Sequence, residues 1–193
     1  MEARKGRLFV LAGPSGVGKG TLRARALSDM EDLAYSVSCT TRQPREGERD
    51  GVDYHFVTAR DFEEKIAGGL FLEHAVVHGH HYGTLLEGVK RKTEAGMDVL
   101  LEIDVQGARQ VRDILPESVL VFIAPPSLDV LEKRLRQRKT ESDDKIAIRL
   151  ENAKKEMALS SEYDRVIVND DLERACGELR DFILSYRESR EQS

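Results

Sequence analysis

The residues best suited to chemistry stand near the start of the chain. The run from Gly13 to Thr21 carries four glycines, a lysine and a threonine, and it joins an apolar stretch to a segment with helical spacing. Glycines let the backbone wrap so that successive N–H groups face inward, and a helix N-terminus adds partial positive charge. The lysine would place a full charge on the β- and γ-phosphates of a nucleotide. The run therefore predicts a triphosphate-binding loop, or P-loop, formed by Gly13, Pro14, Ser15, Gly16, Val17, Gly18, Lys19, Gly20 and Thr21.

The P-loop pattern usually supplies a ligand for Mg²⁺ from the residue directly after its lysine. Here that residue is Gly20, which has no hydroxyl, so Thr21 is the candidate substitute. Glu102 and Asp104 close an apolar run later in the chain, where a carboxylate could hold Mg²⁺ directly or through water. Thr21 and Glu102 are therefore the expected metal ligands.

Composition narrows the class of protein. The chain has 193 residues with a formal net charge of −5, which suits one compact unit and argues against a nucleic-acid partner. No apolar run approaches the roughly 20 residues of a membrane span. Cys39 and Cys176 stand far apart, so neither a disulfide framework nor a structural zinc site is expected. A cytoplasmic location is the expectation.

The elements that must position these residues follow a repeating pattern. Short apolar runs, typical of buried strands, lie at 7–12, 98–103, 118–124 and 165–168. Helical spacing follows them at 20–30, 106–115, 127–138 with 142–159, and 172–186. Strands that alternate with helices predict an α/β fold with a parallel sheet covered by helices on both faces.

The region near 35–83 departs from this pattern and predicts an inserted lobe. Strands are expected at 35–38, 52–57 and 71–77, with a helix at 58–67 that is capped by Thr58. A capped helix is expected to begin at Thr84 and end at Gly96.

The segment from Ser36 to Phe56, SVSCTTRQPREGERDGVDYHF, strongly resembles the signature of the guanylate kinases. The resemblance continues through Glu73, Tyr82-Gly-Thr84, Glu102-Ile-Asp104 and Asn169, from about residue 7 to the last helix. It implies transfer of phosphate from ATP to GMP, with dGMP as a second candidate acceptor and Mg²⁺ as the metal, in purine nucleotide metabolism. It also implies a P-loop core (1–34, 85–125 and 160–193), a GMP-binding lobe (35–84) and a mobile lid (126–159).

The same resemblance assigns roles in binding GMP. In this family, the GMP phosphate is held by the residues that match Arg42, Arg45, Tyr54 and Tyr82. Guanidinium groups are suited to this task because they form bidentate, charge-assisted bonds. Ser38, Glu73 and Thr84 match the positions that read guanine, and Asp104 is grouped with the GMP-binding residues. A carboxylate accepts from guanine N1–H and from its 2-amino group, whereas adenine N1 would present it with a lone pair.

The basic run after residue 132 implies the lid. By resemblance, Arg138 and Arg149 reach the transferring phosphoryl group and act in catalysis with Lys19. Arg134 and Arg138 also contact ATP, and Asn169 lies near adenine. Two other readings stay open: a nucleoside monophosphate kinase for another base, and a non-catalytic binding module of guanylate-kinase type. The oligomeric state does not follow from the sequence.

Overall fold

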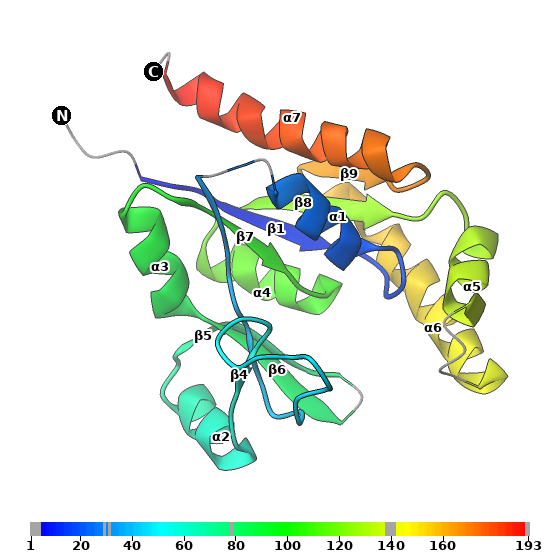
Figure 1. Ribbon diagram of the computed structural model, residues 1–193, viewed down its shortest axis with the longest axis horizontal. Helices are drawn as coiled ribbons and strands as arrows, with labels where there is room; N and C mark the ends of the chain where they lie inside the picture. Colours follow the sequence, from blue (N-terminus) through cyan, green and yellow to red (C-terminus); the bar gives the residue numbers. More distant parts are fainter. Residues whose placement is uncertain (1–4, 29, 31, 78, 138–141, 192–193) are drawn as a thin grey trace. The chain divides into compact units, whose positions relative to one another are not determined.

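A computed structural model describes residues 5–28, 30, 32–77, 79–137 and 142–191. By their contacts these residues form two compact units. The first unit combines the stretches 1–8, 32–101 and 106–118, and the second combines 9–31, 102–105 and 119–193. Each unit carries its own strands, helices and core (Figure 1).

The first unit holds two groups of strands. Strand β2 (Leu33–Tyr35) pairs in parallel with β7 (Asp98–Glu102). A separate four-stranded sheet has the order β4-β3-β6-β5. Its strands are β3 (Cys39–Thr40), β4 (His55–Phe56), β5 (Phe71–Val77) and β6 (His80–Leu85). The helices of this unit are α2 (Ala59–Ala67), α3 (Leu86–Glu94) and α4 (Val105–Ile114).

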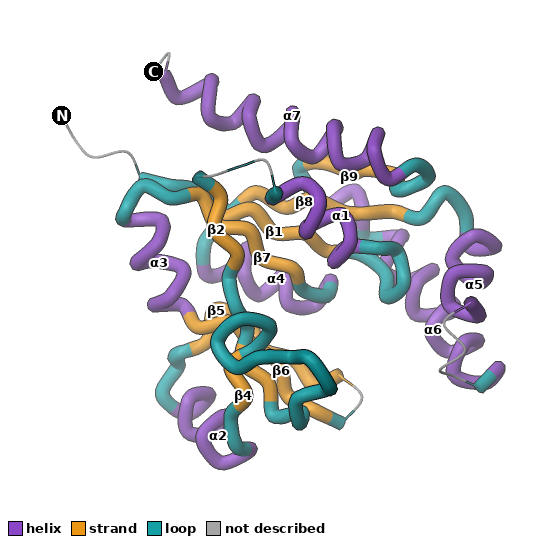
Figure 2. Tube along the Cα trace, in the orientation of Figure 1, coloured by secondary structure: helices purple, strands orange, loops and turns teal. Residues whose placement is uncertain are grey.

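A small apolar core holds α2 against the four-stranded sheet. Phe62 and Phe71 stack with ring centroids 4.4 Å apart, and the buried Cys39 completes the cluster. The helix begins where the sequence predicts, because the side chain of Thr58 accepts a hydrogen bond from the Asp61 N–H at 3.1 Å. This packing fixes the sheet from which the long loop at 41–54 leaves (Figure 2).

The second unit is built on three parallel strands, β1 (Leu8–Ala12), β8 (Val119–Ala124) and β9 (Arg165–Val168), with β8 between the other two. Every residue of β1 and β8 is buried, as in strands covered on both faces. The helices are α1 (Lys19–Leu27), α5 (Leu128–Gln137), α6 (Asp143–Ala158) and α7 (Leu172–Glu191). Helices α5 and α6 share a core of Leu131, Leu135, Ile146 and Ala153, and α1 packs against α7.

The parallel strands with flanking helices confirm the α/β class expected from the sequence. Among the described residues, no helix has the length and apolar character needed to cross a membrane. Two strands were not predicted. Strand β6 carries polar residues and a glycine, so it lacks an apolar strand pattern. The strand expected at 35–38 is wrong in its bounds: the structure has β2 at Leu33–Tyr35 and the short β3 at Cys39–Thr40 instead. The expectation that Thr84 caps a helix is wrong. Thr84 lies on β6, and α3 begins at Leu86 without a side-chain cap.

Candidate functional site: two sets of anion-binding residues

The P-loop has the backbone shape that the sequence predicts. Gly13 and Gly18 have φ angles of +141° and +97°, a region that side-chain-bearing residues rarely adopt. A Cβ atom at Gly13 would lie 2.2 Å from the Ile123 carbonyl oxygen of β8, so the loop passes too close to the strand for any side chain. Lys19 Nζ donates to the carbonyl oxygens of Gly13, at 2.6 Å, and Pro14, at 3.2 Å. The Lys19 side chain therefore lies against the backbone of the P-loop.

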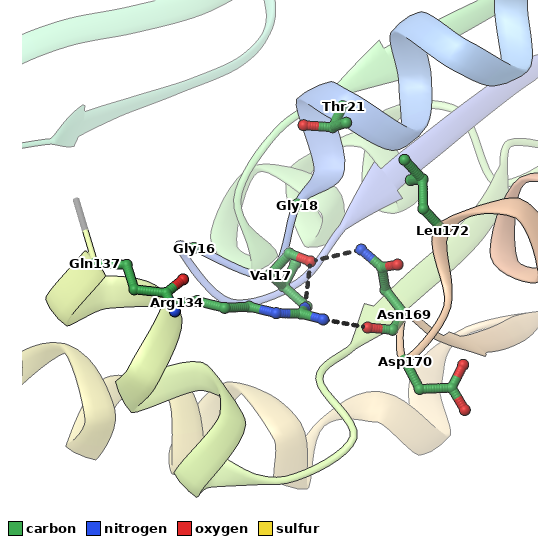
Figure 3. Close-up of a pocket in the computed structure, with 9 residues that line it drawn as sticks. All are labelled: Gly16, Val17, Gly18, Thr21, Arg134, Gln137, Asn169, Asp170 and Leu172. Carbon is green, nitrogen blue, oxygen red and sulfur yellow. Dashed lines mark hydrogen bonds between the residues drawn. The ribbon is translucent and has the colours of Figure 1, made fainter.

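Beside the P-loop lies a cavity of about 470 Å³ (Figure 3). Its lining comes from the loop, from the end of α5 and from the segment after β9. The lining residues are Gly16, Val17, Gly18, Thr21, Arg134, Gln137, Asn169, Asp170 and Leu172. A volume of this size suits a small-molecule ligand.

Hydrogen bonds tie the walls of this cavity together. The buried Asn169 donates its side-chain N–H to the Val17 carbonyl at 2.8 Å. Arg134 donates to the Asn169 carbonyl at 2.8 Å and to the Val17 carbonyl at 3.3 Å. Figure 3 shows that two of these bonds meet at the Val17 carbonyl of the loop and that the third joins Arg134 to Asn169. Arg134 and Asn169, both expected near ATP, are thus held at the P-loop.

The other lid arginines differ in their surroundings. Arg149, on α6, donates to the Ser15 hydroxyl at 3.2 Å, so it too reaches the P-loop. Arg136 instead forms ion pairs with Glu132 and Asp143 at the surface. Arg138 lies outside the described residues.

A carboxylate stands at the head of the first helix. Both oxygens of Glu102 would lie 3.6 Å from a Cβ atom on Gly20, and Glu102 also pairs with Arg23 at 3.4 Å. A hard oxygen donor beside the P-loop fits a magnesium ion held directly or through water. Thr21 is exposed and lines the cavity with Asn169 and Leu172. Among the described residues, no group of three or more His, Cys, Asp or Glu side chains could hold a metal ion.

Sequence reasoning missed one acid near the P-loop. Glu156, on α6, is half-buried, and its pKa is raised above the usual value chiefly by burial. The charge of Lys19 acts in the opposite direction, and that of Asp104 adds to the rise. No sequence motif includes this residue, because helical spacing alone brings it to the P-loop side of α6.

In the first unit, three polar side chains expected to read guanine form one buried chain. Thr84 donates its hydroxyl to Glu73 Oε1 at 2.6 Å, and Ser38 Oγ lies 3.2 Å from Thr84 Oγ1. Glu73 is 4% exposed, so the protein keeps this carboxylate almost out of water. Strands β5 and β6 bring Glu73 and Thr84 directly opposite each other. The cluster can accept hydrogen bonds from a ligand with paired N–H donors.

The loop at 41–54 brings together the residues expected to bind a phosphate. Arg42 forms a two-point ion pair with Glu48, at 2.9 and 3.0 Å, and lies over the Tyr54 ring at 5.4 Å. The rings of Tyr54 and Tyr82 are 5.8 Å apart. Hydrogen bonds to Glu48 and Tyr82 raise the pKa of Arg42 further above its already high value.

Glu48 is a second residue that the sequence analysis did not identify. Besides holding Arg42, it accepts the Arg45 backbone N–H at 2.8 Å, and the bond from Arg42 lowers the pKa of its carboxyl. The carboxylate of Glu48 therefore holds both the guanidinium of Arg42 and the backbone N–H of the exposed Arg45. The sequence signal that could have identified Glu48 is an acidic residue three positions after the R-Q-P-R turn.

The expected site residues thus fall into two sets. The first unit carries Ser38, Arg42, Arg45, Tyr54, Glu73, Tyr82 and Thr84. The second unit carries the P-loop, Glu102, Arg134, Arg149 and Asn169. Asp104, grouped with GMP binding from the sequence, belongs to the second unit.

Comparisons with known proteins point to one family. The family model for guanylate kinase matches residues 5–186. The guanylate kinase of Neisseria gonorrhoeae (strain ATCC 700825 / FA 1090) is 54% identical over 176 residues, which cover 91% of this chain and 86% of that protein. A crystal structure of guanylate kinase from Anaplasma phagocytophilum matches with a TM-score of 0.78 at 32% identity, covering 96% of this chain and 88% of that chain. The SH3-kinase fragment of tight junction protein 3 is similar in fold alone, with a TM-score of 0.51 at 14% identity over 96% of this chain and 59% of that chain.

Proposed function

This chain belongs to the guanylate kinase family, with the P-loop NTPase fold, and we propose that it transfers the γ-phosphoryl group of ATP to GMP, giving ADP and GDP. The observation that carries this proposal is the buried Glu73–Thr84–Ser38 cluster in the unit that also holds the Arg42 anchor. A base reader and a phosphate anchor on the same unit suit a purine monophosphate.

The chemistry of the cluster favours guanine. Its N1–H and 2-amino group both donate, and the Glu73 carboxylate accepts from both. Adenine presents a lone pair at N1, so it would bring an acceptor against the buried carboxylate and supply no hydrogen bond there, which is costly. A site built to bond particular donors can reject an analogue that lacks them by large factors.

The phosphate of GMP is assigned to Arg42, Arg45, Tyr54 and Tyr82. Arg42 already presents its guanidinium in a fixed orientation on Glu48. A planar, five-donor group suits bidentate binding of phosphate oxygens, and tyrosine hydroxyls add donors without further charge. We also assign Asp104 to GMP binding, on the family resemblance.

The triphosphate of ATP is assigned to the P-loop residues Gly13–Thr21. The cavity lined by Arg134 and Asn169 is the proposed place of the adenosine part. Lys19 and Arg149, which both contact the P-loop, are proposed catalytic cations. Arg138, which lies outside the described residues, is added to them on the family resemblance. Lys19 would exchange its carbonyl partners in the loop for phosphate oxygens.

The reaction needs no general base. A phosphate monoester is already an anion near neutral pH, so its oxygen is a nucleophile without deprotonation. The task of the protein is to align two anions and to neutralise charge as the phosphoryl group moves. The lid assigned to 126–159 would exclude water that could otherwise take the phosphoryl group.

We propose Mg²⁺ as the divalent cofactor. Glu102 is the first candidate to hold it, because its carboxylate lies beside Gly20 of the P-loop, and Thr21 is the second candidate. When bound, the ion supplies positive charge to the triphosphate.

The remaining assignments rest on the family resemblance and on composition. The proposed core comprises 1–34, 85–125 and 160–193, with 35–84 as the GMP-binding lobe. We place the protein in the cytoplasm and in purine nucleotide metabolism, with no nucleic-acid or membrane partner and with dGMP as a possible second acceptor.

A panel of acceptors tests the proposed function. ADP formation is measured with GMP, dGMP, IMP, AMP and UMP, each with and without Mg²⁺. Turnover with GMP that exceeds turnover with AMP by orders of magnitude is the expected result. Equal turnover with AMP would refute the guanine assignment, and no turnover with any acceptor would favour a non-catalytic binding module.

A further inference from the structure

Strand β5 carries the base reader Glu73 and lies at the end of its sheet. The strand order β4-β3-β6-β5 gives β5 a neighbour, β6, on one side only. An end strand exposes backbone N–H and C=O groups that have no ladder partner, and its register is less firmly held than that of a central strand.

One side chain supplies the missing partner at one position. Gln110, on α4, accepts a hydrogen bond from the His74 backbone N–H at 3.0 Å and donates its own N–H to the His74 carbonyl at 3.0 Å. An amide that both accepts and donates in this way reproduces the pair of bonds that a neighbouring strand would make. Gln110 therefore acts as a one-residue extension of the sheet.

The two bonds from Gln110 to His74, here called the clamp, lie next to an irregularity in the β5–β6 ladder. The register between β5 and β6 shifts between Phe71 and Glu73, so β5 contains an irregularity immediately before the base reader. Bulges of this kind re-aim the side chains that follow them. A slip of one residue would turn Glu73 to the opposite face of the sheet, away from Thr84.

We propose that Gln110 is a positioning residue for guanine selection: its two bonds to His74 hold β5 in the register that aims Glu73 at the base. The proposal rests on the proposed GMP kinase function. Gln110 acts through the adjacent backbone, and the Thr84 hydroxyl then fixes the carboxylate that this backbone presents. Loss of the clamp should weaken recognition of the guanine edge and leave ATP binding untouched.

The test compares three variants in the full chain. Gln110→Met keeps the length of the side chain but removes both bonds, and Gln110→Ala removes the side chain. Asp113→Ala alters an exposed residue of the same helix and serves as the control. The measurements are the dissociation constants of GMP and IMP by calorimetry, the KM for ATP, and hydrogen exchange at the His74 amide.

We expect both Gln110 variants to bind GMP about fivefold more weakly, which is the effect of about one lost hydrogen bond of ordinary strength. The preference for GMP over IMP should fall about threefold, because IMP lacks the 2-amino group and depends less on the aim of Glu73. The His74 amide should exchange about tenfold faster. The KM for ATP and all values for Asp113→Ala should stay within about twofold of the unaltered protein.

Three results would overturn the proposal. Unchanged exchange at His74 would mean that the two bonds do not hold the strand. Faster exchange with an unchanged GMP-to-IMP preference would mean that Gln110 has a structural role only. If Asp113→Ala changed GMP binding and His74 exchange as much as the Gln110 variants do, the effect would belong to helix α4 in general and not to the Gln110 bonds. Failure of the unaltered protein to phosphorylate GMP would instead refute the proposed function, and the binding and exchange measurements would still decide the role of Gln110.

Discussion

Replacement of Glu73 by glutamine is the sharpest perturbation of base selection that the structure offers. Glutamine keeps the shape of the side chain, and its oxygen can still accept the Thr84 hydroxyl bond that now measures 2.6 Å. The other end of the group changes from an acceptor to an N–H donor. Guanine would then meet a donor where it presents its own donors.

The size of the effect follows from the bonds exchanged. A hydrogen bond to a charged partner contributes about 1.5–3 kcal/mol, and a buried donor left without a partner costs about 1–3 kcal/mol. Together they give a loss of about 2.5–6 kcal/mol, or a factor of roughly 10² to 10⁴ in kcat/KM for GMP. Adenine N1 is an acceptor, so kcat/KM for AMP should stay constant or rise.

The assay measures ADP formation with GMP and with AMP for the unaltered protein, for Glu73→Gln and for Glu63→Gln. Glu63 is an exposed acid on α2, so its substitution controls for the loss of one negative charge from the same unit. A thermal melt establishes that both variants are folded. If folded Glu73→Gln kept kcat/KM for GMP within about fivefold, well short of the factor expected from the lost bonds, Glu73 would not read guanine.

Further predictions concern the P-loop and the phosphate anchor. Lys19→Ala should abolish turnover and leave the calorimetric GMP affinity within about twofold, because the proposed function assigns the lysine to the triphosphate alone. Gly18→Ala should lower thermal stability and raise the KM for ATP, because φ is +97° there and a Cβ would lie 2.7 Å from the Asn169 amide nitrogen. The bond from Arg42 lowers the pKa of Glu48, so the stability from this pair is full above the unfolded value near 4.5 and disappears as pH falls through the lower folded pKa. Glu48→Gln should therefore melt earlier than the unaltered protein at pH 7 and equally at strongly acid pH.

Each of these three predictions has a matched control variant or a result that would contradict it. A collapse of GMP affinity in Lys19→Ala would contradict separate sites for the two nucleotides. Gly88→Ala, where a Cβ meets nothing within 4 Å on helix α3, should be neutral or stabilising. A stability difference between Glu48→Gln and the unaltered protein that stayed constant from pH 7 to strongly acid pH would show that the ion pair is not its source.

The sequence predicts the parts of this fold in which one local signal dominates. Strand β9 has the predicted bounds, because a short apolar run between a turn and a helix has few alternatives. Helix α2 begins at the Thr58 cap, because a side-chain bond to a backbone N–H is a local matter. The P-loop is predicted for the same reason, since its glycines, lysine and helix start occupy nine consecutive residues.

Other features depend on partners distant in the sequence. Thr84 matches the pattern of a helix cap, but its hydroxyl serves Glu73 because β6 places the two residues side by side. The contact between Gln110 and His74 joins residues 36 positions apart. Glu48 is six positions from Arg42 in a loop, where spacing alone does not determine direction. Family resemblance identifies groups that touch a nucleotide, and the structure adds the groups that orient them.

Both anion-binding sets hold their principal cation on an acceptor of the protein itself. Lys19 is held by two carbonyl oxygens, and Arg42 is held by a carboxylate. A phosphate group carries more negative charge than a carbonyl, so it should draw Lys19 away readily. Arg42 can use its remaining donors for a phosphate while Glu48 keeps the guanidinium in place. Because these side chains are already ordered, binding loses less conformational entropy than it would from a free arginine or lysine. Under the proposed function, such fixed local cations would give each nucleotide a defined place to bind in a chain with a net charge of −5.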